Sequence, residues 1–170
     1  DASLYKHPTL GDPHQWAMTV DLNTCIGCSA CMVACQSENN IPIVGKRQVI
    51  EGREMHWMRM DRYFASSDES DADPELVSQP MMCQHCEEPP CVDVCPTGAS
   101  FKRADGIVLV DRHICIGCRY CMMACPYKAR SFVHEELHDQ NPDVPRGKGC
   151  VESCTLCVHR VDNGGQPACA

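Results

Sequence analysis

The sequence of 170 residues has few of the side chains that usually fill a protein interior. Aromatic residues make up 5% of it, and the apolar fraction of 44% includes 16 cysteines. Without those cysteines, only about a third of the chain is left to build a core. Burial alone is insufficient for such a chain, so we expect a group bound to the thiols to supply part of the folding free energy.

Long basic and long apolar segments are also absent from the sequence. No basic block exceeds a pair such as Lys46-Arg47 or Lys102-Arg103, and the formal net charge is −8, so we predict no nucleic-acid partner. The longest stretch without a charged residue, 22–37, contains four cysteines and several polar residues. A membrane helix needs roughly 18 apolar residues, so we predict no transmembrane span. The start at Asp1 fits removal of an export signal and equally a trimmed N-terminus.

Motifs for substrate chemistry are missing as well. The sequence has no nucleotide-binding glycine loop, no zinc-protease helix motif and no serine or cysteine nucleophile outside its cysteine groups. We therefore predict that the chain is not an enzyme and has no substrate site of its own.

The cysteines that dominate the sequence fall into four groups. The first and third groups share the spacing C-x2-C-x2-C-x3-C, the second is C-x2-C-x4-C-x3-C, and the fourth is looser. In chain order the groups are Cys25, Cys28, Cys31 and Cys35; Cys83, Cys86, Cys91 and Cys95; Cys115, Cys118, Cys121 and Cys125; and Cys150, Cys154, Cys157 and Cys169.

An internal repeat relates the first and third groups. Residues 25–35 and 115–125 share their cysteine, isoleucine, glycine, methionine and alanine positions, and Asp21 and Asp111 each lie four residues upstream. The spacing is that of the iron–sulfur run of bacterial ferredoxins. Gly27 and Gly117 would let backbone amides turn toward the cluster sulfides. The repeat therefore indicates a duplicated iron–sulfur module.

The spacing also predicts which cysteines share a cluster. In such runs three thiolates bind one cubane and the fourth cysteine binds its neighbour, so we predict four [4Fe–4S] clusters in two pairs. The predicted ligand sets are Cys83, Cys86, Cys91 and Cys125; Cys115, Cys118, Cys121 and Cys95; Cys154, Cys157, Cys169 and Cys35; and Cys25, Cys28 and Cys31 with one further thiolate.

Other uses of cysteine fit the spacing poorly. Eight disulfides would require strained bridges within the short blocks. Zinc ribbons use two separated CxxC pairs without a third cysteine at the same interval. No CxxC pair is followed by histidine, which disfavours a c-type haem, and a thioredoxin-like dithiol would stand alone.

The segments between the cysteine groups predict an α+β fold. Residues 56–64 and 106–110 are predicted strands, and short helices are expected after Cys31 and Cys121. Residues 66–75 contain five acids and no base, which is typical of a solvated loop or of a surface that steers a cationic partner. We expect two fused bacterial-type 2[4Fe–4S] ferredoxin modules. The first is split between 17–35 and 145–170, the second is contiguous over 83–130, and 36–82 form an inserted strand and acidic loop region.

The motif order carries a family resemblance. The runs Cys83-Gln-His-Cys86 and Arg119-Tyr-Cys121-Met-Met-Ala-Cys125-Pro-Tyr-Lys128 resemble the four-cluster electron-transfer subunits of the DmsB, NrfC and PsrB type, over residues 17–170. Residues 96–103 and 129–132 look most like the DsrO-type subunits of the DsrMKJOP membrane complexes of sulfur metabolism. Iron–sulfur subunits of alternative complex III and of polysulfide reductases are similar alternatives.

The resemblance implies a function and partners. It implies an electron wire between an NrfD-type polytopic, quinone-interacting membrane subunit and a multihaem cytochrome or molybdopterin subunit, peripheral on the periplasmic side of the cytoplasmic membrane. A soluble polyferredoxin shuttle is the alternative.

The same resemblance bears on the incomplete ligand set. In the family the last motif runs C-x2-C-x11-C-x3-C, so a fourth cysteine is expected three positions after Ala170. That cysteine would complete the set of Cys25, Cys28 and Cys31, and Cys150, otherwise an extra thiol, is the alternative.

Three polar residues near the motifs are candidates for tuning a cluster. His85 either donates a hydrogen bond toward its cluster or faces solvent from a loop. Arg119 and Lys128 either raise the local reduction potential or are ordinary surface bases.

Overall fold

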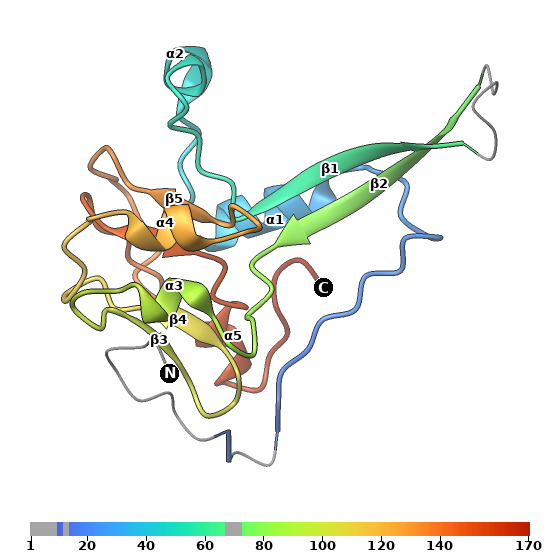
Figure 1. Cartoon of the computed structure of the whole chain (residues 1–170). Helices are drawn as coiled ribbons and strands as arrows, with labels where there is room; N and C mark the ends of the chain where they lie inside the picture. Colours follow the sequence, from blue (N-terminus) through green and yellow to red (C-terminus); the bar gives the residue numbers. More distant parts are fainter. Residues whose placement is uncertain (1–9, 12–13, 67–72) are drawn as a thin grey trace.

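The computed structural model describes residues 10–11, 14–66 and 73–170 and has a mixed α+β fold built from short elements. Most elements gather in one body, from which the β1–β2 hairpin and α2 project (Figure 1). In chain order the elements are α1 (Ala30–Glu38), α2 (Gly45–Ile50), β1 (Met58–Ala65), β2 (Glu75–Met82), α3 (Pro90–Asp93), β3 (Ser100–Lys102), β4 (Val108–Val110), α4 (Tyr120–Ala124), β5 (Arg130–Phe132), β6 (Val151–Ser153) and α5 (Val158–Val161).

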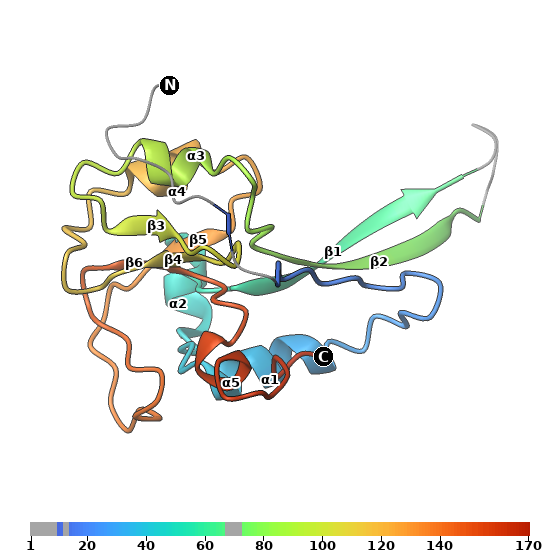
Figure 2. The ribbon, with the colours of Figure 1, turned by 90° about the horizontal axis from the view of Figure 1, so that it is seen from below.

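The strands pair as three antiparallel two-stranded sheets, β1-β2, β3-β4 and β5-β6. The long hairpin runs from Met58 opposite Met82, both buried in the body, to Ala65 opposite Glu75 at its exposed end. Figure 2 shows this hairpin leaving the body on the opposite side from β3 and β6. Residues 67–72 of the predicted acidic loop lie outside the described residues.

The predicted strands are present with shifted ends. β1 begins two residues after the start of the predicted strand 56–64, and β4 covers the last three residues of the predicted strand 106–110. β2 was not predicted, because it contains Ser78, Gln79 and Pro80, which weaken a strand pattern. β3, β5 and β6 have three residues each, which is too short for an alternating pattern.

The sequence repeat folds into the same local structure twice. Asp21 and Asp111 each accept, through Oδ1, the backbone N–H of the residue two positions later, at 2.9 and 2.8 Å. Gly27 and Gly117 have φ of 68° and 69°, a left-handed conformation that glycine adopts without steric cost. A second left-handed residue, Ser29 or Arg119, then begins the helix.

The two helices end differently relative to their last cysteine. Cys35 lies inside α1, as expected, whereas Cys125 is extended and follows the end of α4. The following residue explains the difference, since Pro126 disfavours the helical conformation of the residue before it.

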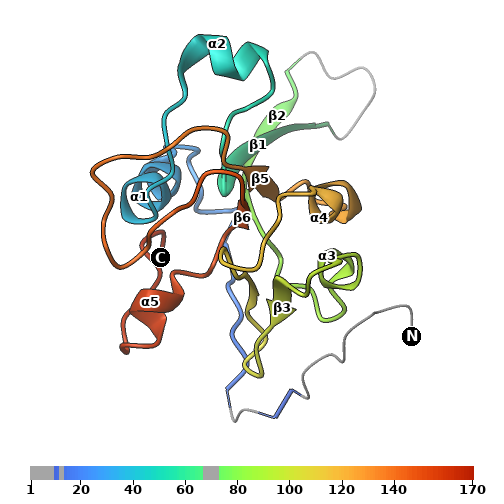
Figure 3. The ribbon, with the colours of Figure 1, turned by 90° about the vertical axis from the view of Figure 1, so that its left-hand side faces the viewer.

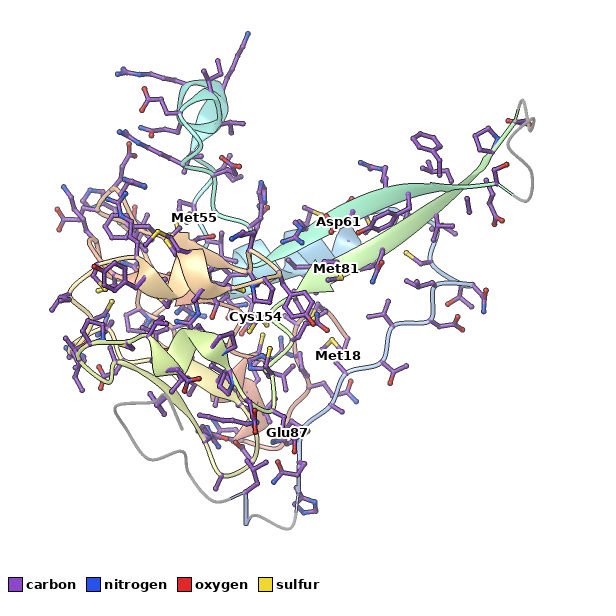
Figure 4. All side chains as sticks on the ribbon, viewed as in Figure 1. Met18, Met55, Asp61, Met81, Glu87 and Cys154 are labelled. Atoms are coloured by element: carbon purple, nitrogen blue, oxygen red, sulfur yellow. The ribbon has the colours of Figure 1, made fainter. Side chains whose placement is uncertain are left out.

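The interior forms two clusters in which cysteine is a major component. One cluster joins Trp57, which is 1% exposed, to Cys35 and Cys154, and the other surrounds Val108 with Cys91 and Cys121. Cys154 lies near the middle of the body (Figure 4). The cysteines therefore occupy positions that larger apolar side chains fill in an ordinary core.

The two clusters correspond to two sides of the body. Figure 3 shows α1 and α5 on one side and α3 and α4 on the other. Glu38 on α1 ties the first pair together, because its carboxylate lies 2.7 Å from Nε2 of His159 and 3.2 Å from Nη1 of Arg160, both on α5.

Within the described ranges, none of the helices combines the length and the apolar composition needed to cross a bilayer.

Candidate iron–sulfur centres

The second and third cysteine groups line two small cavities. The first cavity is lined by Cys83, Cys86, Cys91 and Cys125. The second is lined by Cys95, Cys115, Cys118 and Cys121. Each cavity thus brings together the four cysteines that the motif spacing assigns to one cluster, with the last cysteine of each group reaching across to the other.

Backbone amides point at several of these sulfur atoms. Ser100 N donates to Cys95 Sγ at 3.4 Å, Ala129 N to Cys125 Sγ at 3.4 Å, and Val151 N to Cys115 Sγ at 3.5 Å. Burial opposes ionisation of Cys95, but the bonds from Ser100 and Thr97 bring the pKa of its thiol below the ordinary value. Donors placed in this way stabilise anionic sulfur, as iron ligation requires.

A third group of cysteines meets between α1 and the C-terminal segment. Cys35 lies in electrostatic contact with Cys157 and Cys169, and Cys154 with Cys35 and Cys169. Asn39 Nδ2 joins two of these residues, at 3.5 Å from Cys157 Sγ and 3.7 Å from Cys35 Sγ. The structure therefore gathers the four cysteines of the third predicted set.

The surroundings of Cys31 and Cys150 show where the fourth set lies and in which module Cys150 lies. Cys31 neighbours Cys169, which places the loop of Cys25, Cys28 and Cys31 beside the third set. Cys150 instead donates its S–H to the Arg112 carbonyl oxygen at 3.3 Å and lies against Cys115, in the other module. The structure therefore places Cys150 beside the third cysteine group, in the other module from Cys25, Cys28 and Cys31.

The four sets follow one another in a line. The two cavities adjoin each other, because Cys121 of the second cavity neighbours Cys91 of the first. Cys83 of the first cavity neighbours Cys154 of the third set. Cys169 of the third set in turn neighbours Cys31 of the fourth. The order of the sets along the molecule is therefore Cys95, Cys115, Cys118 and Cys121, then Cys83, Cys86, Cys91 and Cys125, then Cys35, Cys154, Cys157 and Cys169, then Cys25, Cys28 and Cys31.

The ionisation of the buried thiols tests whether these sites fit a metal cluster. Burial raises the pKa of the Cys91 thiol to about 11 and that of Cys35 to about 12. Such thiols ionise at neutral pH only beside strong positive charge, which the iron ions of a cluster provide. All sixteen cysteines are free thiols. In the described ranges no three His, Cys, Asp or Glu side chains converge closely enough to hold a single ion, and the two cysteine sets of residues 83–125 line cavities instead. The residues present therefore fit four-iron clusters.

Of the three candidate tuning residues, His85 neither donates toward a cluster nor faces solvent, whereas Arg119 and Lys128 are exposed, as expected of surface bases. His85 is half-buried, and its Nδ1 accepts the Val108 N–H at 2.9 Å; burial lowers the pKa of this imidazole to about 4, so it is neutral. Arg119 is exposed and stacks on the Phe132 ring at 4.2 Å, and the exposed Lys128 donates to the Met123 carbonyl oxygen at 3.3 Å.

Two other polar residues lie beside the cysteine sets, and motif spacing gave no signal for them. Asn39 contacts sulfur atoms of the third set, and Arg130 lines both cavities of the second module. One sequence feature could have indicated Arg130. It is a charged residue at the start of a strand that lies shortly after a cysteine motif.

Comparison with known proteins gives the same assignment. Two family models, both described as 4Fe–4S dicluster domains, match residues 75–170 and 24–99. The chain is 44% identical to Hdr-like menaquinol oxidoreductase iron-sulfur subunit 1 of Archaeoglobus fulgidus, over 89% of this chain and 61% of the relative. It is 39% identical to the iron-sulfur cluster-binding subunit of the menaquinone reductase of Nitratidesulfovibrio vulgaris, over 86% and 60%. It is 33% identical to the arsenate respiratory reductase iron-sulfur subunit ArrB of a Shewanella species, over 89% and 75%.

The fold and the cysteine sets define an iron–sulfur electron-transfer protein. The chain belongs to the 4Fe–4S dicluster domain family, within the iron–sulfur subunits of the DmsB and PsrB type. It spans between 55% and 61% of the length of the first three curated relatives it matches.

Proposed function

We propose that the four cysteine sets bind four [4Fe–4S] clusters in a line, and that the chain is the electron wire of a membrane-bound respiratory complex. The clusters, when bound, each accept and release one electron without a change of ligands. The chain's residues hold them in sequence. Residues 83–130 form one module, residues 17–35 with 145–170 form the other, and one further thiolate completes the set of Cys25, Cys28 and Cys31.

The surroundings of the two ends of this line carry the proposal. Of the sixteen cysteines, Cys28 and Cys118 are the exposed ones, and they belong to the first and last sets of the line. They also occupy equivalent positions of the repeat, ninety residues apart. The line therefore reaches the surface at both ends and is covered by protein in between, as required for electrons to pass from one partner to another.

Apolar side chains surround both ends. Ile26 is 86% exposed and Val33 64%, and their counterparts in the repeat, Ile116 and Met123, are 67% and 64% exposed. A shuttle that stays in solution has no need for such surfaces, whereas a subunit held between two partners covers them on assembly. This observation favours the complex over the soluble polyferredoxin.

The partners follow from the relatives as a proposal. An NrfD-type polytopic membrane subunit that exchanges electrons with quinone would dock at one end, and a multihaem cytochrome or molybdopterin subunit at the other. We place the chain on the periplasmic face of the cytoplasmic membrane, and we propose a complex of the DsrO-containing type. The names of the relatives, which include a menaquinol oxidoreductase and a menaquinone reductase, support a quinone-linked complex of this kind.

One pair of cysteine variants tests the ligand sets. Cys154→Ser removes a proposed ligand, so we expect loss of one cluster, or its conversion to a three-iron form, with the other three retained. Cys150→Ser is the matched control, because Cys150 is the one cysteine of the sixteen outside the proposed sets, and it should keep all four clusters. Iron and acid-labile sulfide per chain, together with EPR-monitored redox titration of the anaerobically purified complex, give the result. About sixteen irons are expected in the parent protein, and fewer than about twelve would contradict the four-cluster proposal.

Release of the chain as a soluble protein without partner subunits would favour the shuttle.

A further inference from the structure

Arg130 lies between the two cysteine sets of the second module. It is the first residue of β5 and is 5% exposed. Among the described residues it alone lines both cavities, that of Cys83, Cys86, Cys91 and Cys125 and that of Cys95, Cys115, Cys118 and Cys121. The fold therefore places one buried guanidinium at the boundary of two neighbouring sites.

The hydrogen bonds of this guanidinium are incomplete without a further acceptor. Nη2 donates to Ser100 Oγ at 2.8 Å, but Nη1 is buried and has no hydrogen-bond partner. A buried donor of this kind costs free energy unless an acceptor is supplied. The acceptors at this position are the sulfur atoms that surround the two cavities.

The charge of Arg130 is also uncompensated by a carboxylate. None of the ion pairs found between described residues involves Arg130. An isolated buried cation is strongly unfavourable, so its counter-charge has to come from the sulfur ligands.

A second arginine, the half-buried Arg146, shows the ordinary arrangement. Arg146 lies near Cys35 and Cys157, but it stacks on the Trp57 ring at 4.0 Å. Its Nε donates to the Asn39 carbonyl oxygen at 3.1 Å and lies 3.9 Å from Glu152 Oε2. Its charge is thus partly balanced by protein groups, whereas that of Arg130 is available to the sites it separates.

We propose that Arg130 is the shared counter-ion of the two clusters of residues 83–125, donating from Nη1 to sulfur at their boundary and raising both reduction potentials. The inference rests on the proposed ligand sets. Reduction adds one electron to a cluster and breaks no bond, and the guanidinium keeps all its protons. Its attraction is therefore stronger for the more negative, reduced state, and because it faces both sites it also weakens the repulsion between two electrons on neighbouring clusters.

The test compares two arginine-to-glutamine changes in the full chain within its complex. Arg130→Gln should lower two of the four midpoint potentials together. At a fixed solution potential, the ratio of reduced to oxidised cluster should fall tenfold or more at both sites, which corresponds to ~59 mV for one electron. Arg119→Gln removes the same charge from an exposed side chain that lines only the cavity of Cys95, Cys115, Cys118 and Cys121. Because solvent screens that charge, it should change the ratio of at most one cluster, by about twofold. EPR-monitored titration gives the midpoints, and iron content gives the occupancy.

The outcomes separate the two proposals. A parent protein with fewer than four clusters overturns the ligand sets, whereas four clusters with midpoints unchanged by Arg130→Gln overturn the role of Arg130. If Arg130→Gln does not load its clusters, Arg130→Lys decides, because an ammonium keeps the charge but lacks the fork that serves two sites. At least one of the two midpoints should then fall by a threefold or larger change in ratio, and four unchanged midpoints contradict the proposal.

Discussion

At the scale of single residues, two adjacent asparagines at the end of α1 contact different kinds of atom. Asn39 is 1% exposed, and its Nδ2 faces Cys35 Sγ and Cys157 Sγ. Asn40 instead fixes a loop, since its Nδ2 donates to the carbonyl oxygens of Asn141 and Val144, both at 2.9 Å. One amide is therefore placed to act on a cluster site and the other on the backbone.

This difference makes Asn39→Leu informative. The change removes N–H donors from ligand sulfur, so the cluster of Cys35, Cys154, Cys157 and Cys169 should become harder to reduce, by about a threefold change in the ratio of reduced to oxidised cluster. The free energy of unfolding should also fall, by about 1–3 kcal/mol. EPR-monitored titration and thermal melts measure the two effects.

Asn40→Gly is the control for Asn39→Leu. Asn40 has a φ of 53°, which glycine tolerates, so this change removes hydrogen bonds without adding strain. It should reduce stability to a similar extent and leave all four midpoints in place. Equal midpoint shifts in both variants would show that Asn39 acts only through the fold.

Spacing predicted the cysteine sets but not the residues that surround them. The cysteines are few enough residues apart that local geometry limits their partners, which is why Cys95 and Cys125 could be assigned to the opposite cavity. Arg130 and Asn39 are placed by tertiary structure. β5 must pair with β6 before Arg130 lies between the cavities, and α1 must reach Cys157 before Asn39 contacts it. No local pattern contains that information.

At the scale of elements, the repeated loops depend on glycine for two separate reasons. Gly117 has a positive φ, and a Cβ at this position would collide with the Gly149 carbonyl oxygen and the Phe132 ring. Gly52 also has a positive φ, of 66°, but no atom lies within 4 Å of the position of its Cβ. Substitutions at these two glycines can therefore distinguish the free-energy cost of the backbone conformation from the cost of close packing.

We expect Gly117→Ala to prevent loading of the cluster bound by Cys115, Cys118 and Cys121. Backbone strain alone costs about 1 kcal/mol for alanine at positive φ. At Gly117 the added Cβ also forces the loop away from Gly149, and this movement displaces the cysteines of the loop. Gly52→Ala should cost only the strain and keep the full iron content. Iron content and melting temperature report the difference, and equal losses in the two variants would contradict the packing explanation.

The elements predicted from sequence were those with a strong local signal. The helices after Cys31 and Cys121 and the strands near 56–64 and 106–110 are present, because the repeat and the apolar runs mark them. The hairpin partner β2 and helix α2 were missed. β2 is held in place by its register with β1 rather than by its own composition, and α2 (Gly45–Ile50) has no buried residue, so no amphipathic pattern marks it.

At the scale of the whole molecule, the four cysteine sets hold the fold together. Cys35 and Cys154 belong to one interior cluster and Cys91 and Cys121 to the other, so the proposed ligands are also core residues. Segments far apart in sequence, such as α1 and the C-terminal segment, meet at these cysteines. Cluster binding and folding are therefore coupled, since the same side chains serve both.

Removal of iron should accordingly unfold the chain. After anaerobic oxidation and chelation, the buried thiols become neutral, and cavities such as those lined by Cys91 and Cys121 lose their contents, at a cost on the order of several kcal/mol each. We expect loss of the cooperative melting transition in circular dichroism and increased binding of a hydrophobic dye.

Iron release should be biphasic, with the two clusters at the exposed Cys28 and Cys118 leaving before the two covered ones. Protein treated with oxidant and no chelator, then reduced again, is the control. An iron-free chain that melts cooperatively at the temperature of the loaded protein would show that the polypeptide core is sufficient by itself.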